Sequence, residues 1–152
     1  QYNFLSFLTA ATDALLYCQT FTNLAEAEGI GTCFLGTTIY NPRPIIELLR
    51  LPKLVMPVAT LTIGWPDEAP TQPDRLPVES ILHEETYTDY TTESIDQYYK
   101  VKESLAENKH FVEMNHTETL AQVFTDIRYK KSDNEAMSAN LIDTLRQQGF
   151  IP

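Results

Sequence analysis

A helical pattern runs through residues 4–27. Apolar side chains recur there at three- and four-residue intervals, and almost no charge interrupts any face before Glu26. The positions are Phe4, Phe7, Leu8, Ala11, Leu15, Cys18, Phe21 and Ala25. A nearly charge-free helix is typical of a central position, so we expect this one to be well buried. Gly29 is the expected stop, because glycine tolerates the left-handed conformation that ends many helices.

Two apolar runs predict buried strands with a helix between them. Residues 32–37 combine β-branched and aromatic side chains between glycines. Residues 55–66 form a nearly continuous apolar run without charge, as expected of a strand covered on both faces. Residues 41–52 predict the helix, with Asn41 as a candidate N-cap and Pro42 at the first helical position. The first part of the chain therefore alternates helix and strand.

The remaining chain is predicted to be extended and then helical. Residues 66–77 are rich in proline and lack hydrophobic periodicity, which predicts extended chain that crosses the surface. Residues 78–90 are irregular or partly extended, and residues 92–108 predict a helix of mixed charge. Residues 134–150 predict a terminal helix that stops at Gly149.

Helices and strands in alternation, followed by helices, predict a layered α/β or α+β domain. With 152 residues and a mass of 17.3 kDa, the chain suits a single domain over residues 1–152 with a real core. It begins without methionine and inside a helical pattern, so we expect it to be the latter part of something longer.

The charge balance limits the partners. A formal net charge of −10 and a pI near 4.6 disfavour nucleic acid and anionic membranes, although a local basic pocket can still hold a small anion. No apolar run approaches the ~18–20 residues that a bilayer span needs. Cys18 and Cys33 form neither a disulfide framework nor a metal quartet, and their apolar neighbours favour buried hydrophobes over reactive thiols. These observations favour a soluble protein in a reducing compartment, the cytoplasm.

Three glycines lie close together, at Gly29, Gly31 and Gly36. A phosphate loop would need a lysine after Gly36, where this chain has Thr37. A dinucleotide fingerprint would follow a strand and open a helix, and here that order is reversed. Two interpretations of Gly36 stay open. It either forms a tight turn at the end of a strand, or it lets a flat ligand approach bare backbone N–H groups.

The histidines and the densest basic run suggest no metal or cofactor chemistry. His83, His110 and His116 are scattered and lack metal-ligand spacing, so no metal site is predicted. Residues 128–131 are expected to form a surface or dimer contact rather than a cofactor clamp.

A series of motifs stands in one order along nearly the whole chain. It comprises an Asp-Ala…Gln helix, Ala-Glu-x-x-Gly-Ile-Gly, an aromatic-apolar-Gly turn, a Leu-Pro pair, and Gly-Trp-Pro leading to Arg-Leu-Pro. The residues are Asp13, Ala14, Gln19, Ala25, Glu26, Gly29, Gly31, Phe34, Leu35, Gly36, Leu51, Pro52, Gly64, Trp65, Pro66, Arg75, Leu76 and Pro77. The ordered series resembles the FMN-dependent nitroreductase family, in particular its NADPH-type, oxygen-insensitive branch.

The resemblance implies an α+β fold. It would be a three-layer αβα sandwich around a central mixed sheet, carried here without its N-terminal part. It also implies a homodimer with FMN at the interface, and ping-pong hydride transfer from NAD(P)H to a small-molecule acceptor. Nitroaromatics, quinones and flavins are the implied acceptors. Because the flavin carries the redox chemistry, no catalytic side chain is implied. The rival hypothesis is a non-catalytic flavin-binding or dimerisation module of the same fold.

The resemblance implies five cofactor-binding residues. Phe34, Leu35, Gly36 and Thr37 form the turn whose backbone amides would face the flavin ring and stabilise the negative charge of its reduced form. Arg75 stands where the family keeps a basic residue that binds the FMN phosphate. A guanidinium group can bind a phosphate through two parallel hydrogen bonds.

The chain departs from the family pattern in several places. Relatives often have a second glycine where this chain has Thr37, and a lysine where it has Pro73. The N-terminal phosphate motif and first strand of the family are absent, and about 80–100 residues would complete a domain of the usual size. Lys100, Lys102 and Lys109 lie in the broad region of the NADPH-binding loop, and a solvated helix face accounts for them equally well.

Overall fold

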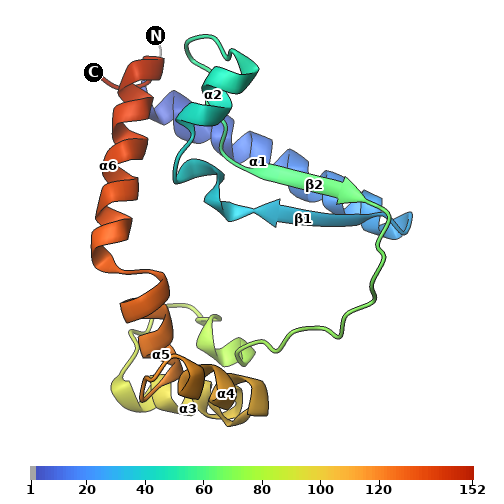
Figure 1. Cartoon of the computed structure of the whole chain (residues 1–152), viewed down its shortest axis with the longest axis vertical. Coiled ribbons are helices and arrows are strands. Elements are labelled where there is room, and N and C mark those ends of the chain that lie inside the picture. The colour runs from blue at the N-terminus through green and yellow to red at the C-terminus, as the bar shows by residue number, and fades with distance from the viewer. Residues whose placement is uncertain (1–2) are drawn as a thin grey trace. The chain divides into compact units, whose positions relative to one another are not determined.

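The computed structural model describes residues 3–152 and divides the chain into two compact units. The first unit holds the chain up to Ala69 together with Ser132–Pro152, and the second holds Pro70–Lys131. Figure 1 shows the helices and strands of each unit. The assignment of residues 1–152 to one nitroreductase-like domain stays a prediction.

Helix α1 spans Phe4–Ala27, as the apolar pattern predicts. Asn3 caps its first turn, because the Asn3 side-chain oxygen accepts a hydrogen bond from the Ser6 N–H at 3.0 Å. Gly29 follows the helix with a φ of +76°, in the left-handed region. The predicted stop is therefore confirmed.

Two strands, β1 (Gly31–Leu35) and β2 (Thr60–Gly64), pair in antiparallel fashion, with Gly31 opposite Gly64. Helix α1 packs along one face of this pair (Figure 1). Helices with an antiparallel sheet confirm the α+β class. Residues 3–152 supply this pair and no further strand, so the mixed sheet of the expected sandwich is not formed by them alone.

Both strands are shorter than the apolar runs that predict them. Residues 55–59 lie outside β2. Pro57 has no N–H to donate to a neighbouring strand, so the regular ladder begins only after it. The first run stops being a strand at Leu35, and the 3-10 helix η1 (Gly36–Ile39) follows. The predicted strand bounds are wrong at these ends.

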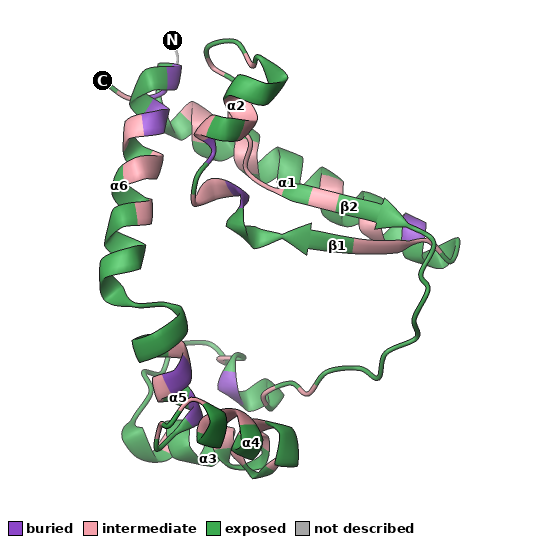
Figure 2. Cartoon of the chain, viewed as in Figure 1, coloured by how far each residue is buried: buried purple, intermediate pink, exposed green. Residues whose placement is uncertain are grey.

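The burial expected for α1 and β2 is not provided by the described chain. Within α1 only Ala25 is buried, and within β2 only Leu61 is even half-buried (Figure 2). The exposed fractions are 71% at Leu5, 63% at Leu16, 74% at Tyr17 and 65% at Leu24. Cys18 is half-buried and Cys33 is exposed, so the expectation of a buried hydrophobe is wrong for Cys33. These predictions fail because no other element among residues 3–152 covers the faces concerned.

Helix α2 spans Arg43–Leu49, inside the predicted range 41–52. Pro42 rather than Asn41 occupies the cap position, and no side chain caps this helix. The predicted cap is wrong because the Asn41 side chain is engaged elsewhere. Its amide oxygen accepts a hydrogen bond from Asn140 Nδ2 at 3.3 Å.

The core of the first unit surrounds the end of α6 (Lys131–Gln148). Leu145 and Phe150 are buried, and the Phe7 ring centroid lies 5.2 Å from that of Phe150. The helix stops at Gly149, whose φ of +86° confirms the prediction. It begins before residue 134, where the sequence pattern predicts its start.

Polar contacts join α2 and the loop after it to α6. Arg43 pairs with Asp143, and Arg43 Nε donates to the buried Thr144 hydroxyl at 3.3 Å. The Leu54 N–H donates to the Gln148 carbonyl oxygen at 2.9 Å. These contacts fix the loop between β1 and β2 to the terminal helix.

The second unit is helical. Residues 66–77 lead into it without helix or strand, as predicted. Its elements are η2 (Val78–Ser80), α3 (Thr92–Ser104), α4 (Ala106–Met114), α5 (Leu120–Gln122) and the π-helical turn η3 (Val123–Arg128). The predicted helix over 92–108 is interrupted at Leu105, whose ψ of 136° is extended. Leu120 and Val123 are fully buried and form the apolar centre of this unit.

A capping box fixes the start of α3. The Thr91 hydroxyl accepts from the Ser94 N–H at 3.2 Å, and the Thr91 N–H donates to the Ser94 hydroxyl at 2.9 Å. Backbone hydrogen bonding at Glu93, and then a hydrogen bond from Thr91, lower the pKa of the Glu93 carboxyl. The ionised Glu93 carboxylate therefore stabilises the folded state above the ordinary carboxyl pKa. This stabilisation is lost as the pH falls through the lowered pKa of Glu93.

We expect Thr91→Ala to lower the free energy of unfolding by about 1 kcal/mol at neutral pH, because the N-cap is removed. The deficit should shrink as the pH falls through the lowered pKa of Glu93, because the protonated carboxyl no longer accepts from Thr91 in the wild-type protein. Denaturant titrations at neutral pH and across the acid range measure this. Thr92→Ala is the control, since the Thr92 hydroxyl makes no hydrogen bond within residues 3–152. Equal losses in the two variants would contradict the role of the cap.

Candidate functional site

The predicted flavin-edge turn, residues 34–37, lies where β1 passes into η1. The side chains of Phe34 and Leu35 are 38% and 41% exposed, and Gly36 and Thr37 are exposed as well. The structure therefore places these four residues together, by chain continuity, at an accessible position of the first unit.

A buried hydroxyl group holds this turn. Thr38 is 6% exposed; its Oγ1 donates to the Leu35 carbonyl oxygen at 3.0 Å and lies 2.9 Å from the Thr60 hydroxyl. The contact with Thr60 ties the end of β1 to the start of β2, so the sheet fixes the backbone of the turn. The sequence marks Thr38 only as a small hydroxyl residue after a glycine, and nothing in the pattern identifies its partner.

Nothing among residues 3–152 requires glycine at position 36. The φ of Gly36 is not in the left-handed region, and a Cβ built there would meet no atom within 4 Å. Glycine in a helix or strand costs about 0.5–1 kcal/mol relative to alanine. Open space beside an exposed backbone would admit a flat ligand, and Gly36 also stands at the turn from β1 into η1, so both interpretations of Gly36 stay predictions.

The start of η1 also presents N–H donors. The first residues of a 3-10 helix have no acceptor inside the helix, and no side chain caps this one. Within the described chain, the N–H groups of Gly36 and Thr37 therefore remain available to an acceptor that reaches the turn from outside.

Arg75 lies in the second unit, at the end of the proline-rich segment. Its side chain is exposed, and its Nη1 donates to the Asp74 carbonyl oxygen at 3.2 Å. The other guanidinium donors have no partner within residues 3–152, so they can bind an anion. The turn and Arg75 belong to different units, and the phosphate-binding role of Arg75 stays a prediction.

The three lysines near the predicted NADPH loop have different surroundings. Lys102 Nζ pairs with Asp74 Oδ2 at 2.6 Å. Lys109 lines a shallow depression together with carboxylates such as Glu103, and Lys100 is exposed on α3. The Lys102 ion pair is a feature that sequence reasoning missed, because its partner lies 28 residues away in an irregular segment.

The remaining polar candidates make local contacts. His83 Nδ1 accepts from the Thr88 N–H at 3.3 Å, and the His83 ring lies 4.7 Å from that of Tyr87. Across residues 3–152, no three His, Cys, Asp or Glu side chains are grouped so that they could hold a metal ion. None of the helices in this range has both the length and the apolarity that crossing a membrane demands.

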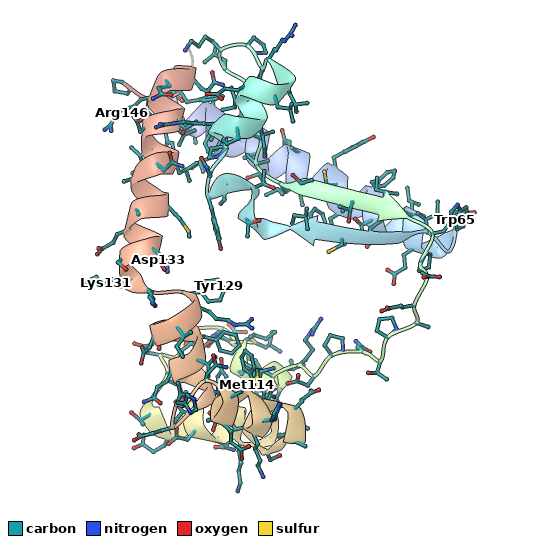
Figure 3. The ribbon with its side chains drawn as sticks, viewed as in Figure 1. Trp65, Met114, Tyr129, Lys131, Asp133 and Arg146 are labelled. Carbon is teal, nitrogen blue, oxygen red and sulfur yellow. The ribbon has the colours of Figure 1, made fainter. Side chains whose placement is uncertain are left out.

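Trp65 follows β2 directly and is 79% exposed (Figure 3). Ile63, at the end of the same strand, is 55% exposed. Two large apolar side chains are thus open to solvent at one end of the sheet.

Curated proteins with similar sequences are flavin-linked reductases. The chain is 42% identical over 95 residues to an FMN reductase [NAD(P)H] of Bacillus subtilis, an alignment that covers 61% of this chain and 38% of that protein. It is 34% identical over 100 residues to the oxygen-insensitive NADPH nitroreductase of Salmonella typhimurium, which covers 66% of this chain and 40% of the relative. No profile of a known protein family matches the sequence.

A solved structure is similar over almost the whole chain. The putative oxidoreductase from Bacteroides fragilis superposes with a TM-score of 0.95 at 59% sequence identity. The alignment covers 99% of this chain and 61% of that one.

These likenesses confirm the resemblance to the nitroreductase family: the chain is homologous to NAD(P)H-dependent FMN reductases and nitroreductases, and its fold is theirs in part. The chain spans about two fifths of the length of the two curated relatives. The enzymatic activity that the full-length relatives are named for is therefore only proposed for this chain.

We expect Thr38→Val to lower the free energy of unfolding by about 1–2 kcal/mol, because the isosteric methyl group leaves the Leu35 carbonyl and the Thr60 hydroxyl without their partner. Chemical denaturation measures the loss. Thr37→Val is the matched control: its hydroxyl is exposed and makes no hydrogen bond within the described chain. A Thr38→Val variant as stable as Thr37→Val would show that the hydroxyl contact does not hold the turn.

Proposed function

We propose that the protein is an FMN-dependent NAD(P)H oxidoreductase that reduces nitroaromatics, quinones or flavins. When bound, FMN would supply the redox chemistry, taking a hydride from NAD(P)H and delivering electrons to the acceptor in a ping-pong cycle. The observation that carries the proposal is the rigid, open turn at Gly36, because its geometry suits a flat ring. The names of the homologous reductases support the same cofactor pair.

The turn would orient the ring and stabilise charge on it. Thr38 holds the backbone in place, Gly36 leaves space beside it, and the N–H groups of Gly36 and Thr37 are free of acceptors within the described chain. Donors that are fixed before the ligand arrives stabilise developing negative charge without reorganising. Backbone amides cannot lose their protons at physiological pH, so this stabilisation would not depend on the titration of any side chain.

Arg75 would bind the phosphate group of the cofactor. Its exposed guanidinium group has donors to spare, and the prolines around it restrict the chain and so reduce the entropy lost on binding.

We also propose that the protein acts as a homodimer in the cytoplasm. The chain exposes 11961 Å² of surface, whereas two separately compact proteins of the sizes of its units would expose about 9,400 Å². The excess, roughly 2,500 Å² for one chain, exceeds the roughly 1,000 Å² a subunit that the smaller obligate dimers bury. The apolar side chains of α1 supply part of it, and Asp13 is the one charge that this helix carries before Glu26, so two copies can approach despite a net charge of −10. Free thiols at Cys18 and Cys33 fit a reducing compartment.

A second candidate is a flavin-binding or dimerising module without turnover. Pro73, in place of a lysine in the family pattern, favours it because the phosphate would meet less positive charge. The two proposals differ in whether NAD(P)H is consumed.

The direct test is the colour of the purified protein. The oxidoreductase proposal expects a yellow protein whose flavin absorbance bleaches when NADPH or NADH is added and returns when a quinone is supplied. A flavin that binds but is not reduced by either nucleotide would favour the non-catalytic module. A colourless protein that neither binds added FMN nor oxidises either nucleotide would reject the oxidoreductase and the flavin-binding module, and would leave only a dimerising module.

Gly36→Ala separates ligand binding from folding. We expect FMN affinity to fall about tenfold, equivalent to about 1.4 kcal/mol, because the added methyl group occupies the space of the ring. The free energy of unfolding should change by less than about 0.5 kcal/mol, because that methyl group meets no atom of the described chain. Gly64→Ala is the control, since a Cβ there also meets no atom within 4 Å. Unchanged affinity in Gly36→Ala would remove Gly36 from the site.

Leu16→Glu tests the dimer. We expect the dimer fraction at micromolar concentration to fall, because a carboxylate would enter an apolar interface, while the fold persists since Leu16 is already 63% exposed. Light scattering coupled to size-exclusion chromatography measures the mass. Gln19→Glu adds the same charge to the same helix without removing apolar surface. A Leu16→Glu protein that stays fully dimeric would exclude this face of α1 from the interface.

A further inference from the structure

The residues on either side of Arg75 are both attached to helix α3. Asp74 pairs with Lys102 in the last turn of that helix, at 2.6 Å. Leu76 is half-buried and lines one apolar cavity together with Ile95 and Tyr98 of the same helix. Arg75 itself is exposed between these two attachments. A segment without helix or strand is thus paired with α3 before its one arginine and borders a cavity of the same helix after it.

Lys102 is itself well fixed. Its carbonyl oxygen accepts hydrogen bonds from Asn108 Nδ2 at 2.8 Å and from the Leu105 N–H at 3.3 Å, at the break between α3 and α4. The side chains of Lys102 and Asp74 are 24% and 29% exposed, so water screens their attraction less than it would at an open surface. The pair is therefore a firm attachment point for the irregular segment.

The ion pair also changes the charge that an anion meets at Arg75. The Asp74 carboxylate is the nearest acid along the chain, and an uncompensated carboxylate there would repel a phosphate and compete for the guanidinium group. The Lys102 ammonium group neutralises it. Arg75 is then left with most of its donors unused.

We propose that Lys102 is a positioning residue for anion binding by Arg75: by pairing with Asp74 it holds the arginine in place and cancels the neighbouring negative charge. This rests on the proposed function, in which the anion is the phosphate of FMN. This role of Lys102 differs from both interpretations of the sequence, in which Lys102 either binds NADPH or lies on a solvated face of its helix.

The test compares two flavins that differ only in the phosphate. Equilibrium dissociation constants of the whole protein for FMN and for riboflavin are measured by flavin fluorescence quenching. We expect Lys102→Met to weaken FMN binding about tenfold, or about 1.4 kcal/mol, and to leave riboflavin binding within about twofold of wild type. Arg75→Ala should show the same selective loss. Arg50→Met removes an equal charge from an exposed side chain of the first unit and should alter neither affinity.

A double-mutant cycle shows whether Lys102 acts through Asp74. In an Asp74→Asn background the further change Lys102→Met should alter FMN affinity by less than about twofold, because the partner has already been removed. A tenfold loss in that background would mean that Lys102 contacts the phosphate itself, and would overturn the positioning role. Lys102→Arg keeps the pair and should retain FMN affinity. If Lys102→Met fails to fold, the isosteric change Asp74→Asn still breaks the pair; because it also removes the acid, any loss of FMN affinity it causes measures the positioning of Arg75 alone.

The outcomes separate this inference from the proposed function. If the wild-type protein binds FMN and Arg75→Ala weakens that binding while Lys102→Met does not, the inference fails and the proposed function stands. An equal loss of FMN and riboflavin affinity in Lys102→Met also overturns it, since the lysine would then support the fold rather than the phosphate. A wild-type protein that binds neither flavin overturns the proposed function and the inference together.

Discussion

Apolar surface that the chain cannot cover by itself is the constraint on which the rest of the structure depends. Helix α1 is apolar on nearly every face, yet it packs against the β1–β2 pair with one of them, and Leu5, Leu16 and Leu24 remain in water. A helix that is apolar all round is stable only where something surrounds it. The described chain buries apolar side chains mainly around Leu145 and Phe150, where Phe7 from the start of α1 packs against Phe150. Any molecule or further chain that covers this apolar surface would therefore also stabilise the fold.

The candidate site depends on backbone groups and on only one ionisable side chain. The 34–37 turn contributes backbone donors and space, and Thr38 contributes rigidity through its contacts with Leu35 and Thr60. Arg75 is the one charged side chain assigned to the ligand, and helix α3 supports it through residues on both of its sides. A flavin brings its own reactivity, so a protein that binds one needs mainly precise support. In this chain, Thr38 supports the 34–37 turn, and Asp74 and Lys102 support Arg75.

Local rules recover the elements better than their surroundings. The helical spacing predicts α1, and Gly29 and Gly149 predict where two helices stop, because a positive φ is a property of the residue itself. Strand limits are less accessible: Pro57 shortens β2 for a reason visible in the sequence, yet the apolar run around it conceals the effect. Burial does not follow from apolar character alone, because it depends on whether another element packs on the residue. Cys33 and Ile63 of β2 are apolar and still exposed.

For the candidate site too, the sequence predicts some residues and misses others. Motif order is enough to single out the 34–37 turn and Arg75, because these residues are contiguous or carry a distinctive group. The contacts that support them, Thr38 with Thr60 and Lys102 with Asp74, join positions 22 and 28 residues apart. No periodicity encodes such pairs, which only folding brings together. Sequence therefore identifies the groups that would meet a ligand and misses those that hold them.

The Thr38–Thr60 contact has a consequence for how this fold can vary. The hydrogen bond joins the two residues that flank residues 39–59, so the two ends of this connecting segment are held together. Chain between two joined ends can lengthen, shorten or change its helix at modest entropic cost without shifting what lies before them. Helix α2 and the loop after it are also bound to α6 through Arg43 and Leu54, so a change within residues 39–59 has to keep those contacts. The turn at Gly36 is closed off from such changes by the Thr38–Thr60 contact.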